Sequence, residues 1–347
     1  MIEIFPGAGY NICNVMRRTG SIAGQRNYEK KKTCGRKRMI QEGRVEYMDI
    51  RFPHLGIVLD HVGRYISIGG FPVMFYGIII AAGFLVGLFV AQREAKRTGQ
   101  DPEIYLDYLI CMVIPAIIGA RAYYVIFSWD YYKDNLLDII NIRHGGLGIV
   151  GGVAAAILVL LIFAKVRKQK AALMLDTMSM ALLVGQIMGR WGNFFNREAF
   201  GGYTDGPLAM QIPLGYFEQT GRLSEITGAG LMDHLVSVDV GGQTLPYIQV
   251  HPTFLYEGLW NCLVLLVIFL YRKHKKFDGE LLCLYLMGYG LGRFFIEGLR
   301  VDQLQIGDTG IAVTQVVCVC VFAGSLITMI VKRRKAAAAG GTPEKQC

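Results

Sequence analysis

The chain has 347 residues, and hydrophobic side chains make up 53% of it. That is more apolar surface than one soluble core needs, so the composition favours a membrane protein over a soluble one. The formal net charge of +9 could serve a nucleic acid, but Lys and Arg come in short clusters between apolar runs, which is typical of membrane topology signals. We therefore expect no nucleic-acid partner.

Residues 1–47 form a basic N-terminal extension, with ten Lys or Arg against four Glu. They contain no apolar run of the kind that makes a signal peptide. Met48 could serve as the start of the protein. We expect this extension to be disordered, or to come from a reading frame that was assigned too long.

Seven apolar runs follow, and each approaches the roughly 17 to 25 residues that cross about 30 Å of hydrocarbon. They occupy residues 71–91, 104–127, 149–164, 171–188, 254–271, 281–297 and 311–331. The runs predict an all-α fold, a polytopic transmembrane helical bundle of about seven spans. The membrane domain then covers residues 48–335, and residues 336–347 are expected to form a disordered cytoplasmic tail.

The loop charges predict an orientation for these spans. Lys and Arg cluster after the first, third, fifth and seventh runs, and the positive-inside rule places those loops in the cytoplasm. The other loops are poor in basic residues, and residues 202–250 contain only Arg222 against five acidic residues. We expect residues 202–250 to be an extracytoplasmic insertion, with the N-terminus outside and the C-terminus inside.

Polar and ionisable residues lie at the ends of these runs. Placing such residues in lipid costs free energy unless they pair with another group or contact water. In the predicted orientation all of them lie toward the outer face: Tyr76, Arg121, His144, Arg190, Asn193, Asn196, Glu198, His251, Glu257, Tyr289, Arg293 and Glu297. One polar cavity open to the outer leaflet explains why they gather on one side. Guanidinium groups match phosphate oxygens in geometry, so an anionic phospholipid head group is the expected ligand.

Common catalytic and cofactor motifs are absent from the sequence. Neither G-x-S-x-G nor H-E-x-x-H occurs, and the eight cysteines form no C-x-x-C pair. Gly146, Gly148 and Gly151 formally match a dinucleotide fingerprint, but no acidic residue follows about 20 residues later. We expect these glycines to serve close helix packing. No metal and no organic cofactor is expected, and the nucleophile should come with a substrate.

Several sequence motifs point to one known family. They are G-R-W-G-N-F-F-N-R-E-A-F-G at 189–201, R-H-G-G-L at 143–147, H-P-T-F-L-Y-E at 251–257, Y-G-L-G-R-F-F-I-E at 289–297 and the pair Tyr76-Gly77. Singly, each has a plainer interpretation as a capped helix end, a snorkelling arginine or an interfacial aromatic residue. Together they resemble the motifs of the bacterial prolipoprotein diacylglyceryl transferases at each fixed position, over residues 60–335.

That resemblance implies an enzyme of the bacterial cytoplasmic (inner) membrane, crossing it several times. Such an enzyme would move the diacylglyceryl group of phosphatidylglycerol, a membrane lipid, onto the lipobox cysteine of prolipoprotein signal peptides. Glycerol phosphate would leave, in the first step of lipoprotein maturation. The active site would face the outer leaflet.

The resemblance also implies roles for single residues. Arg190 would bind the phosphate or glycerol, Arg293 would stabilise the departing phosphate or the thiolate, and the two could exchange roles. His144 is the candidate base for the thiol, and Tyr289 is the alternative. The remaining predicted site residues would position the head group or the arginines: Asn193, Glu198, Gly201, Tyr76 and Glu297.

Two other membrane functions compete with this interpretation. A phospholipid transporter or flippase would also place charges at a membrane cavity, but transporters often have two related halves and a site near the midplane. This chain shows no repeated halves, and its polar residues lie on one side. A CDP-alcohol phosphotransferase would need an aspartate-rich metal motif within the membrane, which no span contains.

Overall fold

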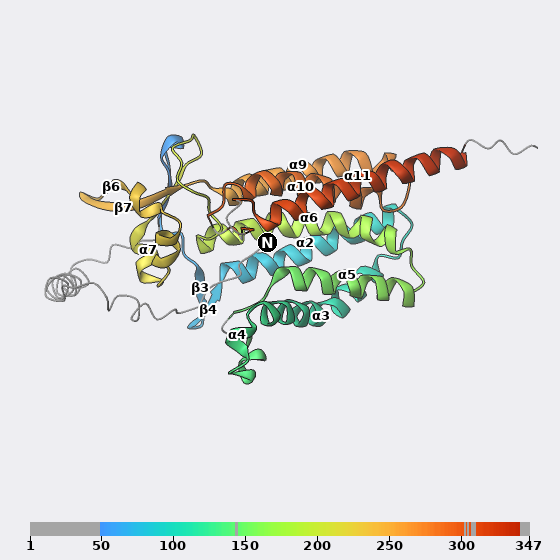
Figure 1. Cartoon of the computed structure of the whole chain (residues 1–347), viewed down its shortest axis with the longest axis horizontal. Coiled ribbons are helices and arrows are strands. Elements are labelled where there is room, and N and C mark those ends of the chain that lie inside the picture. Colours follow the sequence, from blue (N-terminus) through green and yellow to red (C-terminus); the bar gives the residue numbers. More distant parts are fainter. Residues whose placement is uncertain (1–48, 143–144, 302, 304, 307–309, 341–347) are drawn as a thin grey trace, which may run out of the picture.

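The computed structural model describes residues 49–142, 145–301, 303, 305–306 and 310–340. The predictions made for the extension 1–47, for His144 and for most of the tail 336–347 lie outside these residues. Figure 1 shows a bundle of long helices lying side by side, with a small β-sheet at one end.

The bundle consists of seven long helices that match the seven apolar runs in order. They are α2 (Phe75–Arg97), α3 (Glu103–Phe127), α5 (Ile149–Val166), α6 (Ala171–Asn196), α9 (Thr253–Tyr271), α10 (Glu280–Glu297) and α11 (Val313–Gly340). Within the described residues, six of them are long and apolar enough to cross a membrane, all except α10. Helix α10 carries Glu280, Arg293 and Glu297 within 18 residues. The polytopic helical membrane fold is thus confirmed, while a seventh span remains a prediction.

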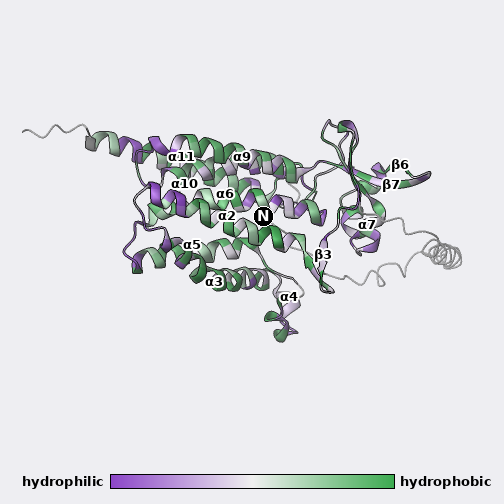
Figure 2. Ribbon diagram, turned by 180° about the vertical axis from the view of Figure 1, so that it is seen from behind, coloured by the Kyte–Doolittle hydropathy of each residue, from purple (hydrophilic) through white to green (hydrophobic). Residues whose placement is uncertain are grey.

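The helix surfaces are apolar where they face away from the bundle. Between 17% and 44% of each candidate span is buried inside the protein, and many large apolar side chains of these helices are exposed, such as Phe89 and Leu270. In water such a surface would be a large exposed hydrophobic patch. Figure 2 shows the hydrophobic colour along the shafts of the helices and hydrophilic colour gathered toward their ends. This distribution fits a bilayer around the shafts.

Close helix contacts depend on glycine. Helix α3 lies against α5, and a Cβ atom on Gly151 would collide with the carbonyl oxygen of Gly119 and with Cβ of Tyr123. Small residues let two helix backbones approach within the membrane, where no hydrophobic effect drives them together. Gly148 and Gly151 thus pack closely against α3 as predicted, whereas Gly146 lies in the loop before α5, against the Arg121 guanidinium.

The end of the bundle away from the sheet is held by ion pairs. Arg272 Nη1 lies 2.6 Å from Glu94 Oε2, which joins α9 to α2. At the start of α10, Asp176 of α6 accepts hydrogen bonds from the backbone N–H groups of Gly279 (2.9 Å) and Leu282 (3.0 Å), and Lys275 Nζ lies 3.1 Å from it. The basic clusters that set the predicted orientation therefore gather at one end, although the orientation itself stays a prediction.

At the opposite end lies a five-stranded antiparallel sheet with the order β2-β1-β5-β7-β6. Its strands are β1 (Ile50–Phe52), β2 (Ile57–Leu59), β5 (Met210–Pro213), β6 (Val236–Val240) and β7 (Gln243–Val250). Short helices α7 (Leu214–Gln219) and α8 (Leu223–Gly228) accompany it, while α4 (Trp129–Tyr132) follows α3. Residues 202–250, whose structure the apolar pattern did not reveal, thus supply three strands, of which β5 pairs with β1 from before the bundle.

The structure corrects the start of the first predicted span. Residues 71–74 form strand β4 (Phe71–Met74), which pairs with β3 (Tyr65–Ile68) in a hairpin. Gly69 and Gly70 at the turn have φ of 57° and 85°, values that suit glycine. Helix α2 therefore begins at Phe75 rather than at residue 71, because the apolar run contains a strand before the helix.

We expect Gly151→Val to weaken the contact between α3 and α5, because the clash is with backbone atoms that cannot move aside. Overpacking of this kind costs about 1 to 3 kcal/mol of unfolding free energy, and more where backbone is involved. Thermal unfolding of the purified protein in detergent measures the loss. Gly324→Ala in α11 is the control, because nothing lies within 4 Å of its added methyl group. Equal unfolding temperatures for the two variants would contradict the proposed contact.

Candidate functional site

Three helices bring their polar ends together beside the sheet. Arg190 lies near the end of α6, Glu257 near the start of α9, and Arg293 and Glu297 near the end of α10 (Figure 1). All four side chains are buried. The chain reverses direction between α6 and α9 and between α9 and α10, so these residues meet at the same level of the bundle.

The register of α9 against α10 is set by an apolar joint. The Trp260 ring occupies the position that a Cβ atom of Gly292 would need, and a Cβ on Gly288 would stand 2.8 Å from Val264. The indole Nε1 donates a hydrogen bond to the carbonyl oxygen of Gly288 at 2.8 Å. The two glycines thus form a notch for Trp260, and this joint fixes where Glu257 stands relative to Arg293.

Glu257 is shared by two arginines. Its Oε1 lies 2.6 Å from Arg190 Nη2, an ion pair whose angle is not that of a hydrogen bond. Its Oε2 accepts a hydrogen bond from Arg293 Nη1 at 2.9 Å. Arg293 Nη2 also lies 2.5 Å from Glu297 Oε2. One continuous network, Arg190–Glu257–Arg293–Glu297, therefore crosses three helices.

The formal charges of this network sum to zero, with two guanidinium groups and two carboxylates. Burying a charge is costly unless a partner of opposite sign is close, and removing one partner leaves the other uncompensated. The network still has donors to spare, since Arg293 Nε has no hydrogen-bond partner in the described part of the chain. An anion could bind there without first breaking an existing pair.

A second set of hydrogen bonds fixes Arg190 from its own helix end. Arg190 Nη1 donates to Asn193 Oδ1 at 3.2 Å, and Asn193 Nδ2 donates to Glu198 Oε1 at 2.9 Å. Asn196 Nδ2 donates to the same oxygen at 3.1 Å. The α6 helix closes at Arg197 with φ of 49°, which turns Glu198 back toward the two asparagines. Glu198 therefore contacts Arg190 through Asn193.

Gly201 and Tyr76 lie at close contacts around this set. The N–H group of Gly201 donates to the carbonyl oxygen of His251 at 2.9 Å, and a Cβ there would stand 2.7 Å from the carbonyl oxygen of Leu299. The Tyr76 ring lies against Gly192 of α6, where a Cβ would come within 2.7 Å of it. Both residues thus lie beside the polar helix ends, and their predicted contacts with a head group stay predictions.

Arg121 holds the loop that carries the R-H-G-G-L motif. Its guanidinium donates to five backbone carbonyl groups: Asp138 (2.6 Å), Ile139 (2.8 Å), Asn141 (3.0 Å), Gly145 (2.9 Å) and Gly146 (2.8 Å). Gly146 has φ of 79°, and a Cβ atom there would collide with the guanidinium. His144 itself lies outside the described residues, but the chain on both sides of it is fastened to Arg121.

Tyr289 is half-buried and lies one turn from Arg293 on α10. Its ring stacks on Tyr285 with centroids 5.8 Å apart. The other histidine of the motifs, His251, lies just before α9, with Nδ1 3.3 Å from the Tyr256 hydroxyl oxygen. Burial lowers the pKa of His251 below its usual value, so its imidazole is neutral at pH 7.

The structure adds Glu257 to the predicted site residues. The sequence placed it among the polar residues at the outer face, but no role was assigned to it. The available signal was the presence of two buried arginines, Arg190 and Arg293. Of the acidic residues predicted beside them, Glu297 pairs directly with Arg293, while Glu198 reaches Arg190 only through Asn193. Two buried cations in one cavity require a second carboxylate nearby. The acidic residue of the H-P-T-F-L-Y-E motif, Glu257, fits that need.

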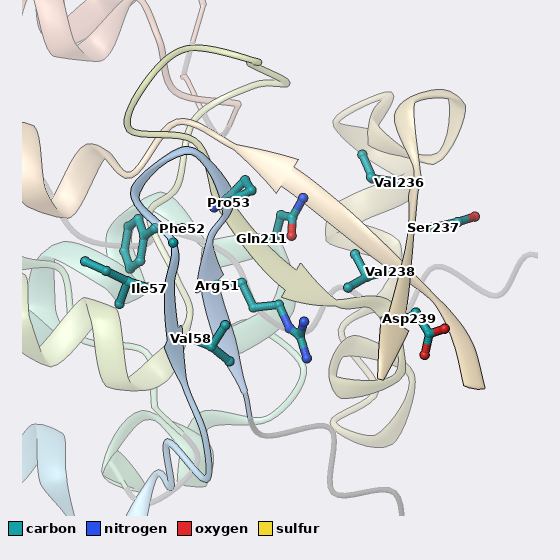
Figure 3. Close-up of a pocket in the computed structure, with 11 residues that line it drawn as sticks. Arg51, Phe52, Pro53, Ile57, Val58, Gln211, Val236, Ser237, Val238 and Asp239 are labelled. Atoms are coloured by element: carbon teal, nitrogen blue, oxygen red, sulfur yellow. The ribbon is translucent and has the colours of Figure 1, made fainter. Parts of the chain in front are cut away.

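The sheet has a hollow of its own, about 380 Å³ in volume. Figure 3 shows it between the β1–β2 hairpin and β6, lined by residues such as Arg51, Val58 and Val238. None of the predicted site residues lines it. In the part of the chain that the structure describes, no group of three or more His, Cys, Asp or Glu side chains is placed to hold a metal ion.

Comparison with known proteins gives the family context. The family model described as prolipoprotein diacylglyceryl transferase matches residues 64–331. Over 276 residues the chain is 41% identical to the phosphatidylglycerol–prolipoprotein diacylglyceryl transferase of Bacillus cytotoxicus, which covers 80% of this chain and 93% of that protein. The protein of the same name from Finegoldia magna is 39% identical over 265 residues, or 76% of this chain and 93% of its own length. Neither of these relatives is named as a lipid transporter.

We expect Glu257→Gln to lower stability strongly. The amide keeps the shape of the side chain but leaves two buried guanidinium groups with one carboxylate, and an uncompensated buried charge costs about 3 to 5 kcal/mol of unfolding free energy. Thermal unfolding in detergent measures the change. Glu218→Gln is the matched control, because Glu218 is exposed and its loss should stay within about 0.5 kcal/mol. A Glu257→Gln protein as stable as the control would show that the network does not need this charge.

Arg121→Lys should loosen the loop of residues 138–146. A lysine ammonium has three donors and lacks the planar fork that reaches five carbonyl groups. Hydrogen exchange followed by mass spectrometry should show faster exchange at the amides of Asn141 and Gly145, which bond within this loop. Amides in the middle of α3 serve as the internal control and should keep their protection. Unchanged exchange in the loop would contradict the role given to Arg121.

Proposed function

The chain belongs to the prolipoprotein diacylglyceryl transferase family, and we propose that the end of its bundle beside the sheet is where it carries out that family's reaction. The chain transfers the diacylglyceryl group of phosphatidylglycerol to a prolipoprotein. The observation that carries the location is the network in which Glu257 joins Arg190 to Arg293 across three helices. It places two buried guanidinium groups, balanced by two carboxylates, at helix ends that would lie beside a bilayer, where a lipid phosphate can arrive from the side.

Arg190 and Arg293 together form the phosphate clamp in this proposal. Arg190 is held by Asn193 and Glu257, and Arg293 by Glu257 and Glu297, so neither side chain must be ordered when lipid binds. Preorganised cations in a site of low dielectric constant stabilise charge as it develops on a leaving group. Glu257 and Glu297 thereby act as positioning residues for the two arginines.

The reaction is an alkyl transfer to sulfur. The thiol of the lipobox cysteine gives its proton to a base. The thiolate then attacks the carbon of the diacylated glycerol that bears the phosphate oxygen of phosphatidylglycerol. A carbon–sulfur bond forms as that carbon–oxygen bond breaks, and glycerol phosphate leaves with the electron pair. We propose His144 as the base, since an imidazole titrates near neutral pH. Tyr289 is the second candidate, although a phenol with an ordinary pKa of about 10 is the poorer base at pH 7.

The proposed cellular setting follows the loop charges. The basic end of the bundle would face the cytoplasm and the end with the sheet would face outward. The site then opens to the outer leaflet of the bacterial cytoplasmic membrane, where it would meet both phosphatidylglycerol and the lipobox cysteine of the precursor. The sheet, outside the membrane in this arrangement, is available to the part of the precursor that follows its signal peptide. We propose no nucleic-acid partner.

An assay with phosphatidylglycerol and a lipobox peptide tests these roles in nanodiscs. We expect Arg190→Lys and Arg293→Lys each to lower the rate by about 100- to 1000-fold, because a lysine cannot satisfy two partners and a phosphate in one plane. The peptide mass, measured over time, reports transfer. Arg167→Lys at the far end of the bundle is the matched control and should keep full activity.

The choice of base is tested in the same assay. We expect His144→Ala to lose nearly all activity and Tyr289→Phe to keep a measurable part of it. The reverse result would assign the proton transfer to Tyr289. Full activity in both variants would mean that neither side chain takes the proton.

A further inference from the structure

A second layer of polar side chains lies one to two helical turns farther from the sheet than the ion-pair network. Gln186 precedes Arg190 by four residues on α6, and Asn261 follows Glu257 by four on α9. Tyr285 precedes Arg293 by eight residues on α10 and joins this layer through its hydrogen bond with Gln186. Four residues are about one turn, or about 5.4 Å along the axis. The same three helices that supply the network therefore supply this layer.

Asn261 is buried without a partner. Its exposed fraction is 0%, and neither its Nδ2 nor its Oδ1 has a hydrogen-bond partner in the part of the chain that the structure describes. A buried amide in this state destabilises a folded protein, and most native structures avoid it. Val264 and Ile268, the next buried residues toward the other end of α9, are apolar, so a leucine at position 261 would suit the packing better. Folding alone gives no reason for an asparagine here.

Gln186 and Tyr285 form the rest of the layer. Gln186 Nε2 donates to the Tyr285 hydroxyl oxygen at 2.9 Å, while Gln186 Oε1 has no hydrogen-bond partner among the described residues. Gln186 is half-buried, while Asn261 and Tyr285 are buried, so Gln186 forms the accessible edge of this layer.

We infer that this layer binds the fatty ester groups of the diacylglyceryl moiety, an inference that rests on the proposed phosphate site at Arg190 and Arg293. In a diacyl phospholipid only the glycerol backbone separates the phosphate from the two ester carbonyls, a span comparable with one helical turn. The ester carbonyl oxygens accept hydrogen bonds and donate none. Asn261 Nδ2 is a donor one turn from the network, and the Tyr285 hydroxyl, beside Gln186, is a second donor farther from it.

Contacts at both levels would fix the glycerol backbone of the lipid from two sides. The phosphate is held by the arginines and the esters by the layer below, so the carbon between them has little freedom. Alignment of that carbon with an incoming thiolate is a large part of what a transfer enzyme can supply. The layer thus assigns Asn261 and Tyr285 to substrate positioning and to selection of diacyl over ether-linked lipid.

The test compares phosphatidylglycerol with its diether analogue, which has the same head group and chains but no ester carbonyls. We measure kcat/KM for both lipids in detergent micelles with a lipobox peptide. The wild-type protein should prefer the diester lipid by roughly 2- to 10-fold, the factor that one or two hydrogen bonds provide. In Asn261→Leu the preference should fall toward one, through a loss with the diester lipid and no change with the diether lipid. The ratio within one variant does not depend on how much of it is folded.

Two further measurements separate binding from a structural role. Asn261→Leu should unfold at the same or a higher temperature, since it removes an unpartnered buried amide. Cys262→Leu changes the neighbouring exposed position on α9 and should leave the lipid preference intact. Equal use of both lipids by the wild-type protein, or an undiminished preference in Asn261→Leu, would overturn the inference while leaving the transfer reaction standing. Use of neither lipid by the folded wild-type protein would overturn the proposed site itself.

Discussion

Buried arginines need carboxylate partners, and this need constrains how the ends of three helices are placed in this molecule. Arg190 and Arg293 lie on helices that touch little along their length, and both depend on one residue of a third helix, Glu257. The ends of α6, α9 and α10 must therefore converge to within the length of a few side chains. Much of the remaining structure meets that demand, from the Trp260 joint between α9 and α10 to the turn at Arg197 that returns Glu198 to Asn193.

The sheet is part of the same arrangement. The chain leaves α6, supplies β5, β6 and β7, and returns directly into α9, so the two helix ends that carry Arg190 and Glu257 are tied by a single folded unit. Its core is apolar and includes Ile212 and Ile248, which are 0% exposed. A rigid connection at one end and ion pairs such as Arg272–Glu94 at the other keep the helices in register.

Much of the bundle could be predicted because hydrocarbon imposes a simple rule on sequence. Apolar runs of sufficient length gave the helices, and the position of Arg293 four residues before Glu297 gave a pair that the structure contains. The sheet could not be predicted this way, since residues 202–250 contain no long apolar run and only one short alternating stretch, Val236–Val240, while residues 71–74 are as apolar as the helix that follows. Glu257 was overlooked as a site residue because its partners come from other helices, and pairing between helices leaves no fixed spacing in one sequence. Asn261 was missed for a similar reason, as its significance lies in the partners it lacks.

Gly288 and Gly292 form a notch for Trp260, and this packing contact holds α9 against α10 independently of the ion pair between Glu257 and Arg293. Because α9 and α10 are fastened by an indole ring and two glycines, their spacing does not rest on the Glu257–Arg293 pair alone. A phosphate that bound at Arg293 Nε, which lacks a hydrogen-bond partner in the described part of the chain, would then leave the spacing of the two helices unchanged. In the proposed reaction, substrate would therefore meet two helices whose spacing is already set by packing.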